Sequence, residues 1–382
     1  MNITATTVFL FTSLLAIAGI AQAKPLKVYI LCGQSNMEGH AQTHTFPAIA
    51  KDPETRYLYD KIVGPDGEPR VHDDIWIEYT YGNFSGDPVG KRAGKLTAGY
   101  GSQHHVGTGK IGPELTFGIT MQEHYGEPIL LIKAAWGGKS LMVDFRPPSA
   151  GELVDHKHAE KAGRYYDLMI EHVREVLAKT PGDYELAGFV WFQGFNDMVG
   201  NYPRVDPSQG RKSIKDYSEY SRLLSCFIRD VRDDLKAPEL PFVVGVLGVG
   251  GKEVSENAKA FHQGMAAPAL TEEFQNTVVN VHSADYWPTE IDAVMEKVNA
   301  VKKTFHRQKR ALKDIDDQDA RRKAAAKLKK EERAAIEAAL TEDELFTLDK
   351  GVSNRGFHYY GSAKFFAQLG EAFARSLIAI GQ

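Results

Sequence analysis

The chain has 382 residues, of which 43% are hydrophobic and 25% are charged, and its net charge at pH 7 is −4. These values exclude a disordered chain, a collagen-like repeat and a protein with many membrane spans. The charge is too close to neutral to indicate nucleic acid or an acidic membrane surface as a partner. We therefore expect a cored, soluble protein of one large domain or two smaller ones.

The N-terminus predicts a secretory signal peptide over residues 1–23. An apolar run, Val8–Ile20, is too short to span a bilayer comfortably and is followed by Ala21-Gln22-Ala23, an A-x-A cleavage pattern. The segment before the run contains no Lys or Arg, so an uncleaved N-terminal anchor is the alternative. On the first interpretation the protein is secreted or periplasmic and keeps no membrane span after cleavage.

Apolar runs alternate with amphipathic segments along most of the chain. The pattern predicts short strands at Leu26–Cys32, Pro128–Ala134, Leu186–Phe192, Pro241–Val249 and Thr277–His282, and helices at Pro113–Tyr125, Tyr165–Leu177, Tyr217–Leu235, Asn257–Ala267 and Ser362–Ile378. This alternation indicates a three-layer α/β/α sandwich with a parallel sheet. The two cysteines, Cys32 and Cys226, fall in a strand and a helix, so we expect two buried thiols rather than a disulfide.

Two regions depart from this alternation. Residues 43–109 are rich in Gly, Pro, Asp and His, which predicts long loops with one strand near Asp74–Tyr81. Residues 291–345 are rich in Lys, Arg, Glu and Ala and predict one or two long exposed helices, forming a hairpin. We interpret this segment as a charged helical insertion in a single catalytic domain made of residues 24–290 and 346–382. A solvated charged face is its simplest role, and a docking site for an anionic glycan or a protein is the alternative.

Polar loops follow three of the predicted strands. Ser35 lies in a Gly-Gln-Ser-Asn-Met turn directly after the first strand, where its hydroxyl and its own N–H can face the same space. Gly137 and Gly138 follow the second strand and offer N–H groups that no side chain screens. Because ligands sit at the carboxyl ends of parallel strands, one site could contain all of these groups.

The order of these blocks resembles the SGNH hydrolase superfamily, and within it the carbohydrate esterases of the sialate O-acetylesterase and acetyl xylan esterase type. The motif GQSNMEG stands where that family keeps its nucleophile, so the resemblance implies that Ser35 is the nucleophile. The segment IKAAWGGKSL is similar to the second block and implies an oxyanion donor among Gly137 and Gly138, beside the N–H of Ser35. The run Gly194-Phe195-Asn196-Asp197 fits the general G-x-N-D pattern and implies Asn196 as the oxyanion amide, whereas the sialate-esterase subgroup points to Gln193 instead.

The last block departs from the family at the catalytic acid. The resemblance implies His358 as the base, but the family places an Asp three residues before this histidine, and here that position is Arg355. A cation cannot stabilise an imidazolium, so two alternatives stay open. Either a backbone carbonyl or Asn354 orients His358 in a Ser-His dyad, or a carboxylate comes from elsewhere. The candidate carboxylates are Asp349, Asp197 and Asp285, and Glu114 and Asp197 are also candidate substrate contacts.

Together these features predict an exported serine esterase that removes O-acetyl groups from carbohydrates. Trp136, Trp191 and Phe195 are candidate platforms for sugar rings, although core packing is their simpler role. The sequence contains no metal-ligand spacing, no P-loop and no dinucleotide fingerprint, so no cofactor is expected. The alternatives are a glycan-binding homologue without catalysis and an esterase for lipid or aryl esters.

Overall fold

The computed structural model describes residues 24–83, 86–103, 109–154 and 156–381, so the predicted signal peptide lies outside the described residues. Seven strands form one sheet in the order β3-β2-β4-β1-β5-β6-β7. Their bounds are β1 Leu26–Gly33, β2 His72–Gly82, β3 Pro88–Leu96, β4 Ile129–Ala135, β5 Tyr184–Phe192, β6 Phe242–Val246 and β7 Val278–His282. Neighbouring strands are parallel except for β3, which pairs antiparallel with β2.

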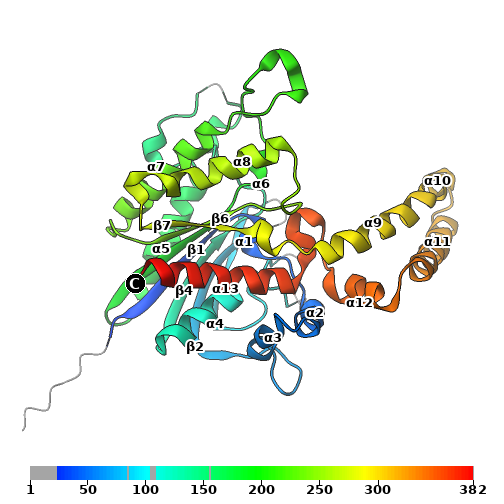
Figure 1. The fold of residues 1–382 in the computed structure, drawn as a ribbon, viewed down its shortest axis with the longest axis horizontal. Coiled ribbons are helices and arrows are strands. Elements are labelled where there is room, and N and C mark those ends of the chain that lie inside the picture. Colours follow the sequence, from blue (N-terminus) through cyan, green and yellow to red (C-terminus); the bar gives the residue numbers. More distant parts are fainter. Residues whose placement is uncertain (1–23, 84–85, 104–108, 155, 382) are drawn as a thin grey trace, which may run out of the picture.

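Helices cover both faces of this sheet (Figure 1). The body contains α1 Ser35–Glu38, α2 Phe46–Lys51, α3 Arg56–Ile62, α4 Glu114–Tyr125, α5 Arg164–Lys179, α6 Phe195–Val199, α7 Ser218–Asp234, α8 Glu256–Ala266 and α13 Ala363–Ile380. Side chains from α5, α7 and α8 share one apolar core with the sheet, and those from α2, α3, α4 and α13 share the other. The predicted three-layer α/β/α sandwich is thereby confirmed.

The centre of the sheet is apolar on both sides. Every residue of β4 is buried, and the last six residues of β1 are buried as well, which is the pattern of strands covered on both faces. Cys32 and Cys226 are buried free thiols, as expected. Within the described residues, no helix is long and apolar enough to cross a membrane.

The region 43–109 is more ordered than predicted. Besides the expected strand, now β2, it contains β3 and the helices α2 and α3, which we had expected to be loop. The predicted parallel sheet thus has one additional, antiparallel strand at its edge, which the sequence analysis did not predict. The reason is that β3 (PVGKRAGKL) has neither an apolar run nor clean alternation and is held by its pairing with β2 alone.

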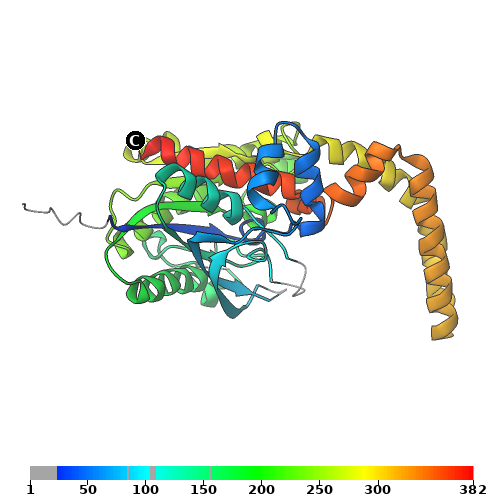
Figure 2. The ribbon, with the colours of Figure 1, turned by 90° about the horizontal axis from the view of Figure 1, so that it is seen from below.

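A helical arm leaves the body beside the carboxyl ends of the strands (Figures 1 and 2). It consists of α9 Thr289–Thr304, α10 His306–Ala311, α11 Gln318–Ala339 and α12 Glu342–Gly351. Val294 and Val298 of α9 pack against Ile336 and Leu340 in a small separate apolar cluster. The region 291–345 is thus helical and exposed, with more helices than expected, while its status as an insertion stays a prediction.

Candidate active site

Three loops meet at the carboxyl edge of the sheet because β4, β1 and β5 are neighbours. The chain leaves β1 into residues 34–39, β4 into residues 136–140 and β5 into residues 193–197. In a parallel sheet such loops lie side by side at the same edge, which is where open α/β sheets bind ligands. The sequence blocks that were expected to share a site are therefore brought together.

Ser35 is the first residue of the short helix α1. Its N–H group has no acceptor within the helix, as is general at a helix start, and its side chain is partly exposed. Its hydroxyl makes no hydrogen bond to any described residue. Hydroxyl and N–H are thus both available to a bound molecule.

Gly137 comes close to Ser35. A β-carbon on Gly137 would lie 3.9 Å from Ser35 Cβ and 3.3 Å from Glu38 Oε2, so a side chain there would crowd the space over the serine. Gly138 has a φ of 72°, a conformation that L side chains rarely adopt. Among the described hydrogen bonds, the N–H groups of both glycines make none, which leaves them as candidate oxyanion donors.

The structure distinguishes the two candidate amides after β5. The side-chain nitrogen of Gln193 is buried, and its two N–H groups are shared among three acceptors: Asp197 Oδ2 at 2.6 Å, the Lys139 carbonyl at 2.9 Å and Gln34 Oε1 at 3.2 Å. It has no proton left for an oxyanion. Asn196 is partly exposed, and its side-chain nitrogen donates to the Gly138 carbonyl. This places the Asn196 amide beside the glycine loop, where the other candidate donors lie.

Asp197 fastens two of the loops together and is not placed to orient His358. Its carboxylate is 1% exposed and accepts hydrogen bonds from the backbone N–H groups of Leu141 and Met142, at 2.8 and 3.0 Å. Tyr202 also donates to it at 3.0 Å. Although these donors favour the carboxylate, burial raises the pKa of Asp197 overall. Its role in the structure is to hold the loop that follows β4 against the loop that follows β5.

The segment before α13 is tied directly to the serine loop. The Asn36 side-chain nitrogen donates to the Phe357 carbonyl at 3.2 Å, which joins the residue after Ser35 to the residue before His358. Two further bonds through Ser353 strengthen this contact, one to the His40 carbonyl at 3.1 Å and one from the Gln42 N–H at 3.1 Å. Residues more than three hundred positions apart therefore form one site.

Asn354 lies against the imidazole of His358. The distance between His358 Nδ1 and Asn354 Oδ1 is 3.1 Å, and the Arg355 N–H donates to the same oxygen at 2.7 Å. Of the two orientations left open for the dyad, the structure shows the one through Asn354. Arg355, at the position of the usual acid, is exposed and contributes backbone groups to the turn.

The surroundings of His358 disfavour its charged form. Burial, followed by the nearby His40 and Lys110, lowers the pKa of His358 to about 2. The rings of His40 and His358 are stacked, with centroids 3.9 Å apart and planes 5° apart. At neutral pH the imidazole is uncharged and has a nitrogen able to accept a proton.

Two residues of the site were not singled out from the sequence. His40 stacks on His358, and the buried carboxylate of Glu38 lies 3.7 Å from His40 Nε2 and beside Gly137. Both follow Ser35 within five residues, in the motif GQSNMEGH. Charged and aromatic residues next to a nucleophile motif are the signal that could have identified them.

The remaining candidate carboxylates lie elsewhere. Asp349 is paired through both oxygens with Arg333 of the arm, at 2.9 Å each. Asp285 is exposed and pairs with Lys252 at 2.8 Å. Glu114 is fully buried and pairs with Lys133 at 2.7 Å, so it cannot contact substrate at the mouth. Among the described contacts, none of the three carboxylates pairs with His358, whose side-chain partner is Asn354.

Of the three aromatic residues that were candidates for packing on sugar rings, only one is near the surface of the site. Trp136 and Trp191 are buried core residues at 1% and 0% exposure, which leaves Phe195. Its ring lies 5.8 Å from that of Phe357, a partly exposed residue next to His358.

A polar cavity of about 540 Å³ opens beside Gly138 and Asn196. Among the residues that line it are Ser140, Asp144 and Asn201, all able to hydrogen-bond. Across the described ranges, no group of three or more His, Cys, Asp or Glu side chains could hold a metal ion. The site therefore offers a hydroxyl, an imidazole and several N–H donors next to a polar hollow.

Comparison with protein families gives the class of this protein. The family model described as "Carbohydrate esterase, sialic acid-specific acetylesterase" matches residues 25–285. The match covers more than half of the chain, so the chain belongs to this family. It is a carboxylic ester hydrolase, as the sequence motifs predicted.

Individual relatives are distant. The chain is 23% identical over 248 residues to an Arabidopsis thaliana protein named "Probable carbohydrate esterase", covering 62% of this chain and 74% of the relative. The solved structure of that protein matches with a TM-score of 0.41 and 20% identity, over 68% of this chain and 86% of that one. A carbohydrate acetylesterase from Xanthomonas citri matches with a TM-score of 0.40 and 14% identity, over 67% of this chain and 49% of that one.

Proposed function

We propose that this protein removes O-acetyl groups from carbohydrates through a covalent acetyl-enzyme on Ser35. The observation that carries the proposal is the meeting of Ser35, Gly137, Asn196 and His358 at one edge of the sheet. A hydroxyl, a neutral imidazole and unscreened N–H donors are the parts that acyl transfer through a serine requires.

In the first half-reaction Ser35 Oγ attacks the acetyl carbonyl and its proton passes to His358 Nε2. The negative charge on the former carbonyl oxygen is stabilised by N–H donors, for which the Ser35 N–H, one of the two glycine N–H groups and the Asn196 amide are the candidates. Collapse of the tetrahedral intermediate breaks the ester C–O bond. The departing sugar hydroxyl takes the proton back from His358, and the acetyl group stays on Ser35.

In the second half-reaction water replaces the sugar. His358 Nε2 takes a proton from the water while its oxygen attacks the acetyl carbon. The Ser35–acetyl bond then breaks, the proton returns to Ser35 Oγ and acetate leaves. No carboxylate is needed to fix the tautomer of His358, because Asn354 Oδ1 accepts the Nδ1 proton.

The lining of the adjacent cavity supports a sugar ester over a lipid ester. Lys139, Ser140, Asp144 and Asn201 surround a hollow next to the proposed oxyanion donors. Sugar hydroxyls both donate and accept hydrogen bonds, whereas an acyl chain needs a continuous apolar groove.

We further propose, from the N-terminal sequence alone, that residues 1–23 direct export and are removed.

The proposal is tested with Ser35→Ala, using Ser149→Ala, an exposed serine outside the site, as the control. Acetate release is measured from acetylated xylan, acetylated pectin and O-acetylated sialic acids, and hydrolysis from 4-nitrophenyl acetate. Ser35→Ala should lose at least about 10³-fold in rate while its thermal unfolding stays close to that of the wild type. Full activity of Ser35→Ala, or no acetate release from any glycan by the wild type, contradicts the proposal.

A further inference from the structure

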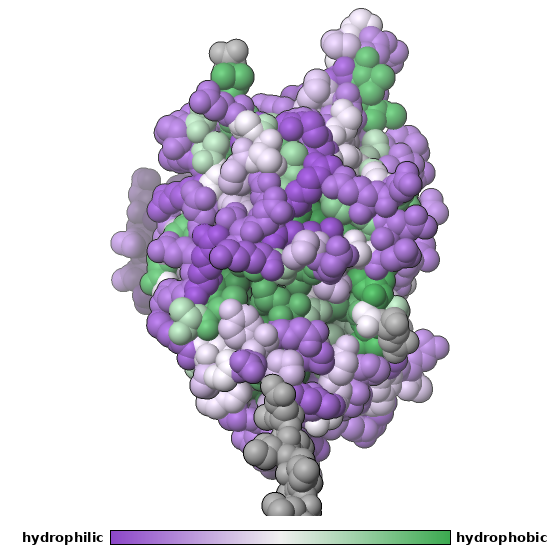
Figure 3. Space-filling model, turned by 90° about the vertical axis from the view of Figure 1, so that its left-hand side faces the viewer, coloured by the Kyte–Doolittle hydropathy of each residue, from purple (hydrophilic) through white to green (hydrophobic). Residues whose placement is uncertain are grey.

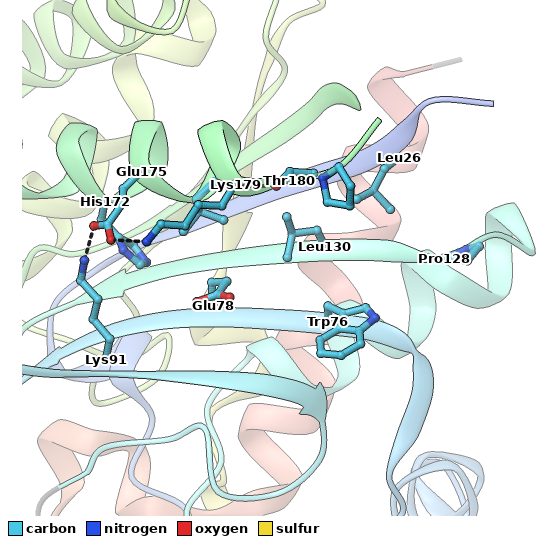
Figure 4. A pocket seen from close by; sticks show the side chains of 12 residues that line it. Leu26, Trp76, Glu78, Lys91, Pro128, Leu130, His172, Glu175, Lys179 and Thr180 are labelled. Atoms are coloured by element: carbon cyan, nitrogen blue, oxygen red, sulfur yellow. Dashed lines mark hydrogen bonds and ion pairs between the residues drawn. The ribbon is translucent and has the colours of Figure 1, made fainter. Parts of the chain in front are cut away.

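A second cavity, of about 510 Å³, lies between α5 and β2 on one face of the sheet (Figure 4). Alternate residues of β2 point to opposite faces, so Ile75 and Ile77 enter the core while Trp76 and Glu78 face the other side. On that side α5 packs over β4 and β1 and leaves β2 uncovered. The cavity is the space between α5 and the uncovered face of β2.

This cavity is remote from Ser35. It includes Leu26 at the start of β1, Pro128 just before β4 and Pro181 just before β5, all at the amino ends of strands. The site described above lies at the carboxyl ends, and Trp76 is level with Val28, which precedes Gly33 at the carboxyl end of β1 by roughly 17 Å of strand. Figure 3 views the molecule from the end opposite the arm and shows apolar surface gathered among polar side chains there.

Trp76 is left half exposed at this cavity. It is 49% exposed, whereas Trp136, Trp191 and Trp287 are exposed by 8% or less. The sequence has four tryptophans, so Trp76 alone presents its ring to solvent. Lys95 Nζ lies 4.3 Å from the centroid of this indole and covers one face of it, so the other face is the flat apolar surface on which the C–H face of a pyranose ring can pack.

Charged groups of both signs surround the apolar floor that Leu130 and Val176 form. Glu78 faces the cavity from β2, while α5 contributes Glu175 and Lys179, whose charged groups lie 2.7 Å apart. Sugar hydroxyls can donate to carboxylates and accept from ammonium groups, so both signs are useful to a sugar. A fatty acyl chain would make no use of them.

His172 is a buried hydrogen-bonding side chain in the wall of this cavity. It is 3% exposed, and its ring faces the backbone of Glu78 in the neighbouring strand β2. Burial lowers the pKa of His172 to about 4, so at neutral pH its ring has one donor and one acceptor. Figure 4 shows the ring on the side of α5 that faces the sheet.

We propose that this cavity binds a pyranose residue of a carbohydrate chain, at a site separate from the one that hydrolyses esters. The proposal takes the carbohydrate class of its ligand from the proposed function, but it requires no turnover. Binding here would keep a polymer on the enzyme while another part of the same chain, or a neighbouring one, is deacetylated at Ser35.

The test is native affinity electrophoresis in gels containing deacetylated xylan, deacetylated pectin or polysialic acid. At least one of these glycans should retard the wild type and Ser35→Ala equally. Trp76→Ala should bind at least about tenfold more weakly. Tyr184→Ala is the control and should bind like the wild type. Tyr184 is also an exposed aromatic residue at the amino end of a strand, but it does not line the cavity. Equal binding by Trp76→Ala and wild type, or no binding to any of the three glycans, overturns the proposal.

A measurement on the wild-type protein covers the case of a misfolded variant. Trp76 is the tryptophan that acrylamide can reach, so a saturating glycan should protect the fluorescence from quenching. Unchanged quenching overturns the proposal. Binding is measured with deacetylated glycans, so it does not depend on hydrolysis. If the protein binds these glycans but releases no acetate from the acetylated ones, the proposed function is contradicted and the binding site is supported.

Discussion

His358 Nδ1 lies 3.1 Å from Asn354 Oδ1, and that oxygen also accepts the Arg355 N–H at 2.7 Å. A backbone N–H can only donate, which fixes the orientation of the Asn354 amide. Nδ1 must then carry the proton, and Nε2 keeps a lone pair, which takes the proton of Ser35 in the mechanism that we propose. A neutral amide thus sets the tautomer that a carboxylate sets in a Ser-His-Asp triad.

Replacing Asn354 tests this positioning role. Asn354→Ala should lower kcat by about 10–100-fold with little change in KM, because the imidazole loses its orientation. Asn354→Asp should retain much of the activity, and its negative charge should raise the pKa of His358 and move the acid limb of the pH profile upward. Asn299→Asp, an exposed change in the arm, is the control. Unchanged kinetics in Asn354→Ala would exclude the role.

The pH dependence of the rate follows from the pKa of His358. Burial, His40 and Lys110 lower this pKa to about 2, so the imidazole stays neutral when the pH falls from 8 to 5. A lowered pKa keeps the base form present on the acid side, and kcat/KM for 4-nitrophenyl acetate should therefore be flat over this range. An acid limb near the ordinary histidine pKa of about 6.5 would show that His358 is not desolvated.

Asn196 and Gln193 should respond differently to truncation. Asn196→Ala removes a candidate oxyanion donor and should lower kcat by about 10²–10³-fold with a small effect on stability. Gln193→Ala removes one hydrogen bond each from Asp197, Gln34 and the Lys139 carbonyl in a buried place, and should cost about 2–3 kcal/mol of the free energy of unfolding. Urea unfolding and steady-state kinetics on both variants separate these outcomes. The reverse pattern would make Gln193 the oxyanion amide.

Stability should fall as the medium becomes acidic, in part through His172 and His358. Their pKa values in the folded protein are lowered to about 4 and about 2, below the unfolded value near 6.5. The unfolded chain therefore binds protons first as the pH falls through 6.5, and each residue removes up to about 2 kcal/mol between pH 7 and pH 5. His172→Gln should lose less stability than the wild type over that interval in urea unfolding. An equal loss in both proteins would show that the His172 ring is solvated in the folded protein, so that its pKa is not lowered.

The central strands and the nucleophile loop could be predicted from the sequence. Residues 26–32 and 128–134 are apolar runs of strand length. They are apolar throughout because these strands are covered on both faces of the sheet. Ser35 stood out because a polar motif directly follows such a run. The antiparallel edge could not be seen, since β3 is held by backbone pairing to β2 and its side chains carry no strand pattern.

The partner of His358 could not be chosen from the sequence alone. Asn354 and Asp349 are both near it in the chain, but Asp349 is at the end of α12 and pairs with Arg333 of the arm. The turn that brings Asn354 to the ring includes Tyr359 and Tyr360 at positive φ of 51° and 58°. Such a conformation is uncommon for tyrosine and depends on packing that residue types do not reveal.

The most direct test of the mechanism is to locate the acetyl group during turnover. The enzyme is mixed with 4-nitrophenyl acetate, quenched in acid within the first turnover, digested and examined by peptide mass spectrometry. We expect an acetyl group on Ser35, in the peptide that contains it, in the wild type and none in Ser35→Ala. Burst release of 4-nitrophenol with the acetyl group on another residue, or unchanged turnover by Ser35→Ala, would contradict it.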